Sequence, residues 1–300
     1  MRALVVGSSG FVGTWLVEYL RSVDDEVQLL PSGVDIRDGE VLREYFQQIQ
    51  VDAVYHLAAQ SHVGRSWSHP EETYMVNVIG TANVCEAVRS MSIPPKLLFV
   101  SSSEVYGRVT QGELPISEVQ SLAPVSPYAA SKAAAEEVVK QLFYGSSIPV
   151  VVARSFNHIG PGQGESFVAS ALAKRLVSAQ MKGTDEIKVG NLKARRDFTD
   201  VRDVVRAYRS MVEKADSFEV FNVCSSSSLS VEQLANLMIK QLNIELKLIV
   251  SPELVRPLDV FEVVGSNAKV RSVTTWKPEI DIQSTIKDLL EYWRGHLLTS

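Results

Sequence analysis

The chain has 300 residues, of which 45% are hydrophobic and 22% charged, with a formal net charge of −5. This length and hydrophobic content suit one large α/β domain or a domain with a smaller lobe. The acidic balance gives no electrostatic reason to expect nucleic acid or an anionic membrane surface as a partner. Cys85 and Cys224 are the only cysteines, and their apolar or small neighbours favour reduced core thiols over a disulfide or a metal site.

The N-terminus and the histidines narrow the expectations further. The first residues, MRALVVG, enter a strand directly without the pattern of a signal peptide, and no apolar run reaches bilayer length. We therefore expect a cytoplasmic protein. His56 is expected to be a packed residue, and His62, His69 and His296 have no second ligand at metal spacing, so no metal is expected.

Short apolar runs alternate with amphipathic stretches in the first half of the chain. Val-, Leu- and Ile-rich runs separated by helices indicate a parallel sheet covered on both faces, which is the doubly wound, Rossmann-type α/β fold. The expected strands are 2–6, 26–30, 52–58, 96–101 and 149–154, and the expected helices lie near 11–22, 39–49, 70–91 and 127–144.

Two features depart from a regular alternation. The segment PSGVDIRDG after the second strand is too short for an ordinary crossover helix, so either that helix is missing or the third strand is vestigial. From about residue 157 the pattern becomes less regular. We expect a dinucleotide-binding domain over 1–156 and a smaller C-terminal α/β substrate lobe over 157–300, some segments of which return to the Rossmann sheet. The helices expected in this second part lie near 165–181, 201–214, 230–242 and 283–294.

The first chemical motif is VVGSSGFVG, which places Gly7, Gly10 and Gly13 directly after the first strand. Glycines at this spacing permit a tight turn, let backbone N–H groups approach a pyrophosphate and let the following helix pack closely. The position of the motif favours dinucleotide binding over an ordinary glycine-rich turn. The second strand ends in QLLPSG, with neither an acid for a ribose 2′-hydroxyl nor an arginine for a 2′-phosphate, so the choice between NADH and NADPH stays open.

The second motif is SPYAASK, in which Tyr128 and Lys132 are four residues apart and share one helix face. The spacing alone proves nothing. A phenol has a reference pKa near ~10, and a cation beside it favours the phenolate. The segment VSSSEVYG adds the hydroxyls of Ser101, Ser102 and Ser103 at the carboxyl end of a strand, where ligands sit in open α/β sheets.

Together these segments resemble a known family. GSSGFVG, HLAAQ (56–60), NVIGT (77–81), SSSEVYG and YAASK are similar to the extended short-chain dehydrogenase/reductases that act on nucleotide sugars. Within that branch, RSFNHIGPGQ (154–163), VGNLKARRDFTDVRDV (189–204), FNVCS (221–225) and GSNAKVRSVTTWKPEI (265–280) resemble the GDP-6-deoxy-4-keto-mannose reductases. The resemblance covers essentially the whole chain.

The resemblance implies a catalytic set. Ser102 would hold the 4-keto oxygen of the substrate, Tyr128 would protonate it as hydride arrives at C4, and Lys132 would lower the pKa of the tyrosine and bind nicotinamide-ribose hydroxyls. Asp35 and Ile36 are expected to contact the adenine. The alternative for Asp35 is that its side chain is simply solvated. The full expected NADPH or NADH site comprises Gly7, Gly10, Phe11, Val12, Gly13, Asp35, Ile36, Leu57, Ala58, Asn77, Tyr128 and Lys132.

The same comparison implies how a GDP-linked 6-deoxy-4-keto sugar is held. Arg196 and Arg256 would clamp the diphosphate from separate segments, because guanidinium groups match phosphate bidentately. His158 either touches the site or has a structural role. The expected substrate residues are Ser103, Glu104, Asn157, Lys174, Arg196, Arg256 and Asp259.

Glu104, counted with the catalytic residues, leaves the reaction type open. In the related GDP-mannose 4,6-dehydratases a glutamate here handles protons at C5 and C6, whereas in the reductases an acid here contacts the sugar. The short segment after the second strand favours a reductase that forms GDP-D-rhamnose or its C4 epimer, GDP-6-deoxy-D-talose. A dehydratase, an epimerase and a non-catalytic subunit are the alternatives. The family also implies a homodimer that pairs the helices near 70–91 and 127–144.

Overall fold

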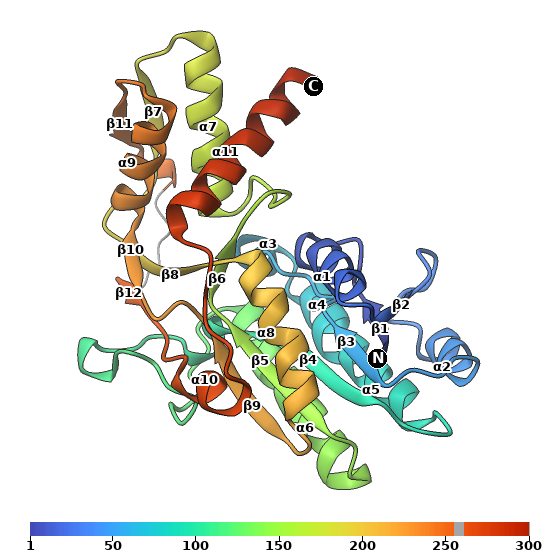
Figure 1. Cartoon of the computed structure of the whole chain (residues 1–300). Helices are drawn as coiled ribbons and strands as arrows, with labels where there is room; N and C mark the ends of the chain where they lie inside the picture. Colours follow the sequence, from blue (N-terminus) through green and yellow to red (C-terminus); the bar gives the residue numbers. More distant parts are fainter. Residues whose placement is uncertain (255–260, 300) are drawn as a thin grey trace.

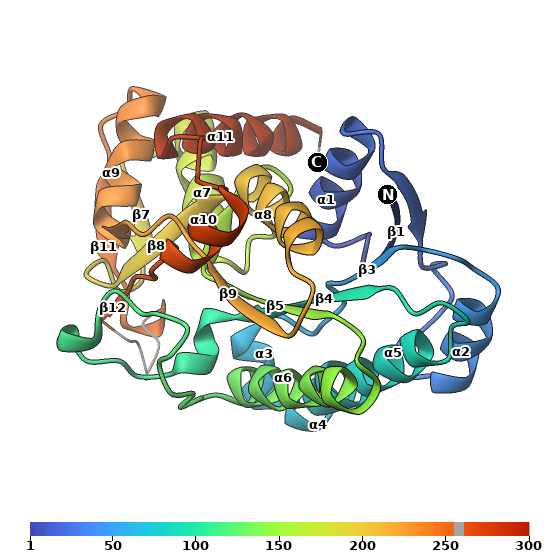
Figure 2. The same cartoon turned by 60° about the horizontal axis from the view of Figure 1, so that its bottom comes forward.

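A computed structural model describes residues 1–254 and 261–299. Six parallel strands form a central sheet in the order β2-β1-β3-β4-β5-β9, with helices on both faces (Figures 1 and 2). This arrangement confirms the predicted doubly wound α/β fold. The strands are β1 (Arg2–Val6), β2 (Glu26–Leu29), β3 (Ala53–His56), β4 (Lys96–Ser102), β5 (Val150–Ser155) and β9 (Glu219–Val223).

Alternate residues of each central strand enter two different cores. Ala3 and Val5 pack with α1 (Phe11–Ser22), α8 (Val201–Lys214) and α10 (Ala268–Thr274) on one face. Leu4 and Val6 pack with the helices of the opposite face, which are α2 (Gly39–Gln47), α5 (Gly80–Arg89) and α6 (Pro127–Ser146). Because both faces are buried, the strands read as unbroken apolar runs in the sequence.

A crossover helix follows the short segment after β2. The chain leaves β2, passes through α2 and enters β3, which pairs with β1 on the side away from β2. The alternative of a missing helix is therefore wrong. Among the described residues β2 is the edge of the sheet, and no strand lies beyond it.

The single helix expected near 70–91 is divided. It consists of α4 (Pro70–Tyr74), a π-helical turn η1 (Met75–Ile79) and α5, and the short α3 (Val63–Ser68) precedes it. A π-helical turn widens the backbone locally and is frequent near functional sites. In this chain the turn contains the buried Asn77.

The second lobe has its own core between α7 (Val168–Lys182), α9 (Val231–Leu242) and α11 (Ile282–Thr299). A small sheet, β10 (Ser228–Ser230), β8 (Arg195–Asp200) and β12 (Glu262–Val263), lies beside it, and β6 (Asn157–Ile159) pairs with β8. β7 (Glu186–Val189) pairs with β11 (Lys247–Val250), and three 3₁₀ turns complete the described elements: η2 (Ser103–Tyr106), η3 (Gln111–Glu113) and η4 (Pro252–Leu254).

The two lobes are joined through a buried carboxylate. Asp197 of β8 accepts hydrogen bonds from the backbone N–H groups of Ser225, Ser226 and Gly265. Burial nevertheless raises the pKa of Asp197 to about 6.

Of the helices in the described ranges, none has the length and apolar character needed to cross a membrane.

Candidate active site

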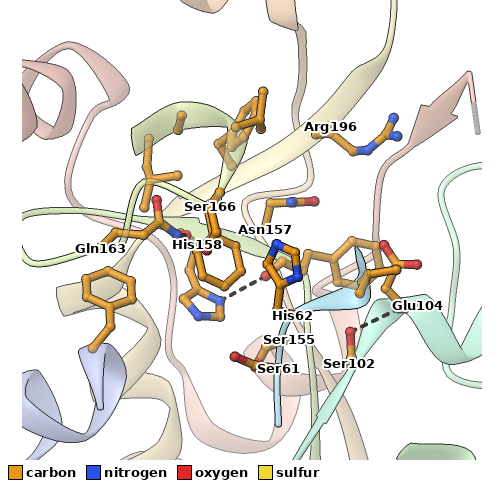
Figure 3. Close-up of a pocket in the computed structure, with 18 of the residues that line it drawn as sticks. Ser61, His62, Ser102, Glu104, Ser155, Asn157, His158, Gln163, Ser166 and Arg196 are labelled. Carbon is orange, nitrogen blue, oxygen red and sulfur yellow. Dashed lines mark hydrogen bonds between the residues drawn. The ribbon is translucent and has the colours of Figure 1, made fainter. Parts of the chain in front are cut away.

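A cavity of about 510 Å³ lies between the carboxyl ends of the central strands and the second lobe (Figure 3). It is the kind of position where open α/β sheets bind their ligands. Four regions contribute to its wall: the glycine-rich turn, the segment after β3, the β4–η2 and α6 region, and the elements β6, α7 and β8.

The glycine-rich turn fits a pyrophosphate. Gly7 has φ +94°, and a Cβ there would lie 2.6 Å from the backbone nitrogen of Ala58. A Cβ on Gly13 would lie 2.1 Å from the carbonyl oxygen of Gly7, so these two glycines are required by the turn itself. Gly10 is different, because its nearest atom, the Gly7 oxygen, would be 3.5 Å from a Cβ.

The open space at Gly10 faces the cavity. Gly10 is the N-cap of α1 and gives that helix no side-chain cap. The first N–H groups of α1 are therefore available to an anion in the cavity, where the helix dipole also favours negative charge. Of the expected cofactor residues, this wall contains Gly7, Gly10, Phe11, Val12, Gly13 and Leu57.

Four other expected cofactor residues do not line this cavity. Asp35 is exposed and forms an ion pair with Arg37. Ile36 is 6% exposed and packs against Gly80 in the core. Ala58 lies beneath Gly7, and Asn77 is buried behind the segment that follows β3.

Asn77 organises the residues in front of it. Its Oδ1 accepts from the Gln60 backbone nitrogen at 2.8 Å, and its Nδ2 donates to the Gln60 carbonyl oxygen at 3.0 Å. Nδ2 also donates to Ser131 Oγ on α6 at 2.8 Å. Asn77 thus fixes the segment after β3 to the helix that carries Tyr128 and Lys132.

The structure brings Ser102, Tyr128 and Lys132 to one wall of the cavity. Ser102 ends β4, and its Oγ accepts from the backbone nitrogen of Glu104 at 3.2 Å (Figure 3). Tyr128 lies in the first turn of α6, which the Ser126 side chain caps, and Lys132 follows one turn later. The helix start and the strand end together position the three groups.

Burial dominates the protonation of the Tyr128 and Lys132 side chains. It raises the pKa of Tyr128 to about 12, against an opposing hydrogen bond with the Ser102 side chain. It lowers the pKa of Lys132 to about 7, although the negative charge of Glu136 opposes this. Lys132 is not among the groups that shift the pKa of Tyr128, and its effect on the tyrosine stays a prediction. Lys132 Nζ instead donates to the Val100 carbonyl oxygen at 2.7 Å.

Behind Lys132 lies an ion pair that sequence reasoning missed. Arg154 of β5 and Glu136 of α6 are both buried, and their charged groups are 2.7 Å apart. Ser101 Oγ donates to the same carboxylate, so this cavity-lining residue also supports the ion pair. The available signal was the spacing of Glu136, which is four residues after Lys132 on one helix face.

The cavity wall also holds part of the expected substrate set. Ser103, Glu104, Asn157 and Arg196 line the cavity. Lys174 does not, because it pairs with Glu165 and lies over the Trp293 ring, whereas the next residue, Arg175, is in the wall. Arg256 and Asp259 lie outside the described residues.

Other side chains in the wall carried no functional prediction. His62, Gln163 and Phe167 line the cavity, as does His158, for which the sequence allows either a contact with the site or a structural role. The His158 ring is stacked on Phe11 with centroids 6.0 Å apart, and burial lowers its pKa, which keeps it neutral. Within the described ranges, no group of three or more His, Cys, Asp or Glu side chains could hold a metal ion.

A glycine-rich turn after the first strand and a Ser–Tyr–Lys set at the carboxyl ends of a parallel sheet define an extended short-chain dehydrogenase/reductase. The family model of GDP-mannose 4,6 dehydratase matches residues 27–289. The chain belongs to this family of enzymes that modify nucleotide sugars.

Individual relatives agree with this assignment. GDP-6-deoxy-D-mannose reductase of Pseudomonas aeruginosa is 35% identical over 301 residues, covering 99% of this chain and 98% of the relative. A structure of RMD from Pseudomonas aeruginosa complexed with NADPH has a TM-score of 0.91 at 34% identity, over 98% of this chain and 99% of that one. The Thermus thermophilus UDP-glucose 4-epimerase complex with NAD has a TM-score of 0.86 at 29% identity, over 98% and 99%.

Proposed function

We propose that the protein reduces the 4-keto group of GDP-4-dehydro-6-deoxy-D-mannose, with NADPH or NADH, to GDP-D-rhamnose. The observation that carries the proposal is that Ser102, Tyr128 and Lys132 line the same cavity as the glycine-rich turn. The full-length similarity to a protein named GDP-6-deoxy-D-mannose reductase supports the choice of substrate.

The protonation of Tyr128 suits a reduction. A ketone reduction needs an acid that gives a proton to the developing alkoxide. With its pKa raised to about 12, the Tyr128 phenol keeps its proton at neutral pH. A reaction that begins by oxidising the C4 alcohol would instead need a base at this position.

The residues divide the work as follows. Ser102 donates a hydrogen bond to the 4-keto oxygen, and Tyr128 transfers its proton to the same oxygen. The reduced nicotinamide, when bound, supplies the hydride that C4 accepts, so that the ketone gains one hydride and one proton and becomes an alcohol. Lys132 stabilises the phenolate that remains on Tyr128 and binds ribose hydroxyls of the cofactor.

The second lobe supplies the grip on the nucleotide diphosphate in this proposal. Asn157 and Arg196 reach the cavity from the neighbouring strands β6 and β8. An amide and a guanidinium group are suitable donors to phosphate oxygens. Arg256 and Asp259 are proposed as further substrate residues.

The residues after β2 bear on which reduced cofactor can bind. Arg37 is the nearest arginine after this strand, and its guanidinium group forms the ion pair with Asp35. NADPH binding would require Arg37 to exchange this carboxylate for a 2′-phosphate, whereas NADH would leave the pair intact. We propose that either reduced cofactor is accepted.

A 4,6-dehydratase is the second candidate, because Glu104 stands in the cavity where an acid–base group for C5 and C6 would be needed. The two functions differ in cofactor balance. A dehydratase returns its hydride and converts GDP-mannose without net change in nicotinamide absorbance, whereas the reductase consumes NAD(P)H and does not act on GDP-mannose.

The test is to incubate the purified protein with each sugar nucleotide and with NADPH or NADH. We expect loss of absorbance at the nicotinamide band only with the keto sugar, and NMR of the product identifies GDP-D-rhamnose or GDP-6-deoxy-D-talose. Turnover of GDP-mannose without net oxidation would reject the reductase in favour of the dehydratase.

A further inference from the structure

We infer that His62 donates a hydrogen bond from Nε2 to a hydroxyl oxygen of the hexose in the nucleotide sugar, and so determines which sugars are accepted. The inference rests on the proposed function for its substrate. His62 lies in the segment after β3. It is not among the predicted catalytic or substrate residues.

The hydrogen bond of the imidazole fixes its tautomer. His62 is the N-cap of α3, and its Nδ1 accepts from the backbone nitrogen of Arg65 at 2.8 Å. A ring nitrogen that accepts a hydrogen bond carries no proton, so in the neutral ring the proton is on Nε2. The ring therefore presents a donor at its far end.

The orientation of the ring is also restricted. A Cβ on Gly64 would lie 2.8 Å from Cε1 of the His62 ring, so the imidazole packs closely over this glycine. Among the residues that the structure describes, Nε2 has no hydrogen-bond partner, and His62 lines the cavity. Figure 3 shows the ring near Asn157 and on the side of Ser102 and Glu104, away from Gln163.

The backbone that carries this ring is held rigidly. The His62 nitrogen donates to Gln60 Oε1 at 2.6 Å, and Gln60 Nε2 donates to Thr73 Oγ1 at 3.0 Å. Gln60 is in turn fixed by both amide atoms of the buried Asn77. Preorganisation of this kind reduces the entropy that binding must overcome.

The chemistry of the site favours a hexose hydroxyl as the acceptor. β3 and β4 are neighbouring strands, so the segment after β3 and Ser102 at the end of β4 lie at the same edge of the sheet. The diphosphate is assigned to Arg196. A neutral N–H donor beside the reacting carbon suits an uncharged hydroxyl oxygen, and a site built for that bond discriminates against a sugar that lacks it.

His62→Asn is the informative variant, because an asparagine N-cap still accepts from the Arg65 nitrogen but cannot reach into the cavity. His62→Ser is a second variant that also caps the helix. His69→Asn is the matched control, since His69 is exposed, precedes α4 and is outside the cavity wall. All are assayed with the keto sugar, and with its 2-deoxy and 3-deoxy analogues, in the presence of NADPH.

We expect His62→Asn to lower kcat/KM for the keto sugar roughly tenfold, with an unchanged Kd for NADPH and an unchanged His69→Asn control. The wild type should reject one deoxy analogue, and the His62 variants should no longer distinguish it from the parent sugar. Equal discrimination by wild type and variants would overturn the inference. Absence of any turnover by the wild type would instead overturn the proposed function.

Discussion

At the scale of single residues, one physical cause shifts the pKa of the acid and the pKa of the cation, each in favour of the neutral form. Tyr128 and Lys132 are both buried, and burial disfavours charge on either group. The phenol therefore retains its proton well above neutral pH, while the ammonium group begins to lose its proton near pH 7. Below about pH 7 both groups therefore carry their protons, and Lys132 is the first to lose its proton as the pH rises.

Tyr128→Phe removes the only atom of this residue that can donate the proton to the ketone. We expect turnover to fall by about 10²- to 10⁴-fold, the usual contribution of a positioned acid. Cofactor affinity should change little, because the ring remains. Steady-state kinetics and a fluorescence titration with NADPH measure the two quantities, and unchanged turnover would remove Tyr128 from the mechanism.

The pKa of Lys132, lowered to about 7, predicts the pH dependence of the reaction. The ammonium form is present below this pKa, so kcat/KM should fall as the pH rises through about 7. Burial lowers the pKa of His158, which moves its titration to more acidic pH and away from this limb. Lys132→Met should be less active at every pH and lack the limb. A wild-type profile that rises through pH 7 would contradict the role of the cation.

At the scale of elements, the turn between β1 and α1 combines two kinds of glycine. Gly7 and Gly13 are required by contacts within the protein, whereas Gly10 leaves space on the cavity side. The turn is therefore fixed before any ligand arrives. Its fixed geometry is what lets the first N–H groups of α1 point into the cavity.

Gly13→Ala tests this geometry, because the new Cβ would overlap the Gly7 carbonyl oxygen. We expect a loss of about 1–3 kcal/mol in the free energy of unfolding, as for other overpacked sites, together with weaker NADPH binding. Gly33→Ala is the matched control, since a Cβ there meets nothing within 4 Å. Urea unfolding and cofactor titration compare the two variants, and similar behaviour of both would show that the turn tolerates a side chain.

At the scale of the whole molecule, α3, α4, α5 and α6 form one layer along the sheet (Figure 2). Tyr74, Met75 and Ile79 on this layer are 40%, 42% and 44% exposed, although each is a large apolar residue. Apolar side chains gathered on one face are typical of a surface that associates. They lie within the helical region for which the sequence predicts a dimer contact.

We predict a homodimer through this layer. Light scattering should give twice the chain mass of 33.1 kDa. Ile79→Glu would place a charge in the contact and should shift the protein towards monomers. Val119→Glu, in the loop on another part of the surface, is the control for an exposed apolar residue and should leave the dimer intact. A monomeric wild type would contradict the prediction.

The sequence predicted those parts of the molecule that depend on local pattern. The five strands and the helices of the first half were recognisable because buried apolar runs and amphipathic stretches differ in period. The residues Ser102, Tyr128 and Lys132 were recognisable from the resemblance. Spacing places Glu136 on the helix face of Lys132, but its pairing with Arg154 and the place of Lys174 outside the wall depend on contacts between distant segments, which no local pattern contains.

The sixth strand of the central sheet has a consequence for how the chain is made. β9 pairs with β5, and α8 and α10 cover the face that α1 begins to cover, yet all three come from residues beyond 200. An N-terminal fragment ending near residue 156 would expose the flank of β5 and a large apolar surface. During synthesis on the ribosome, the nascent sheet must therefore wait for roughly half of the polypeptide before it can close.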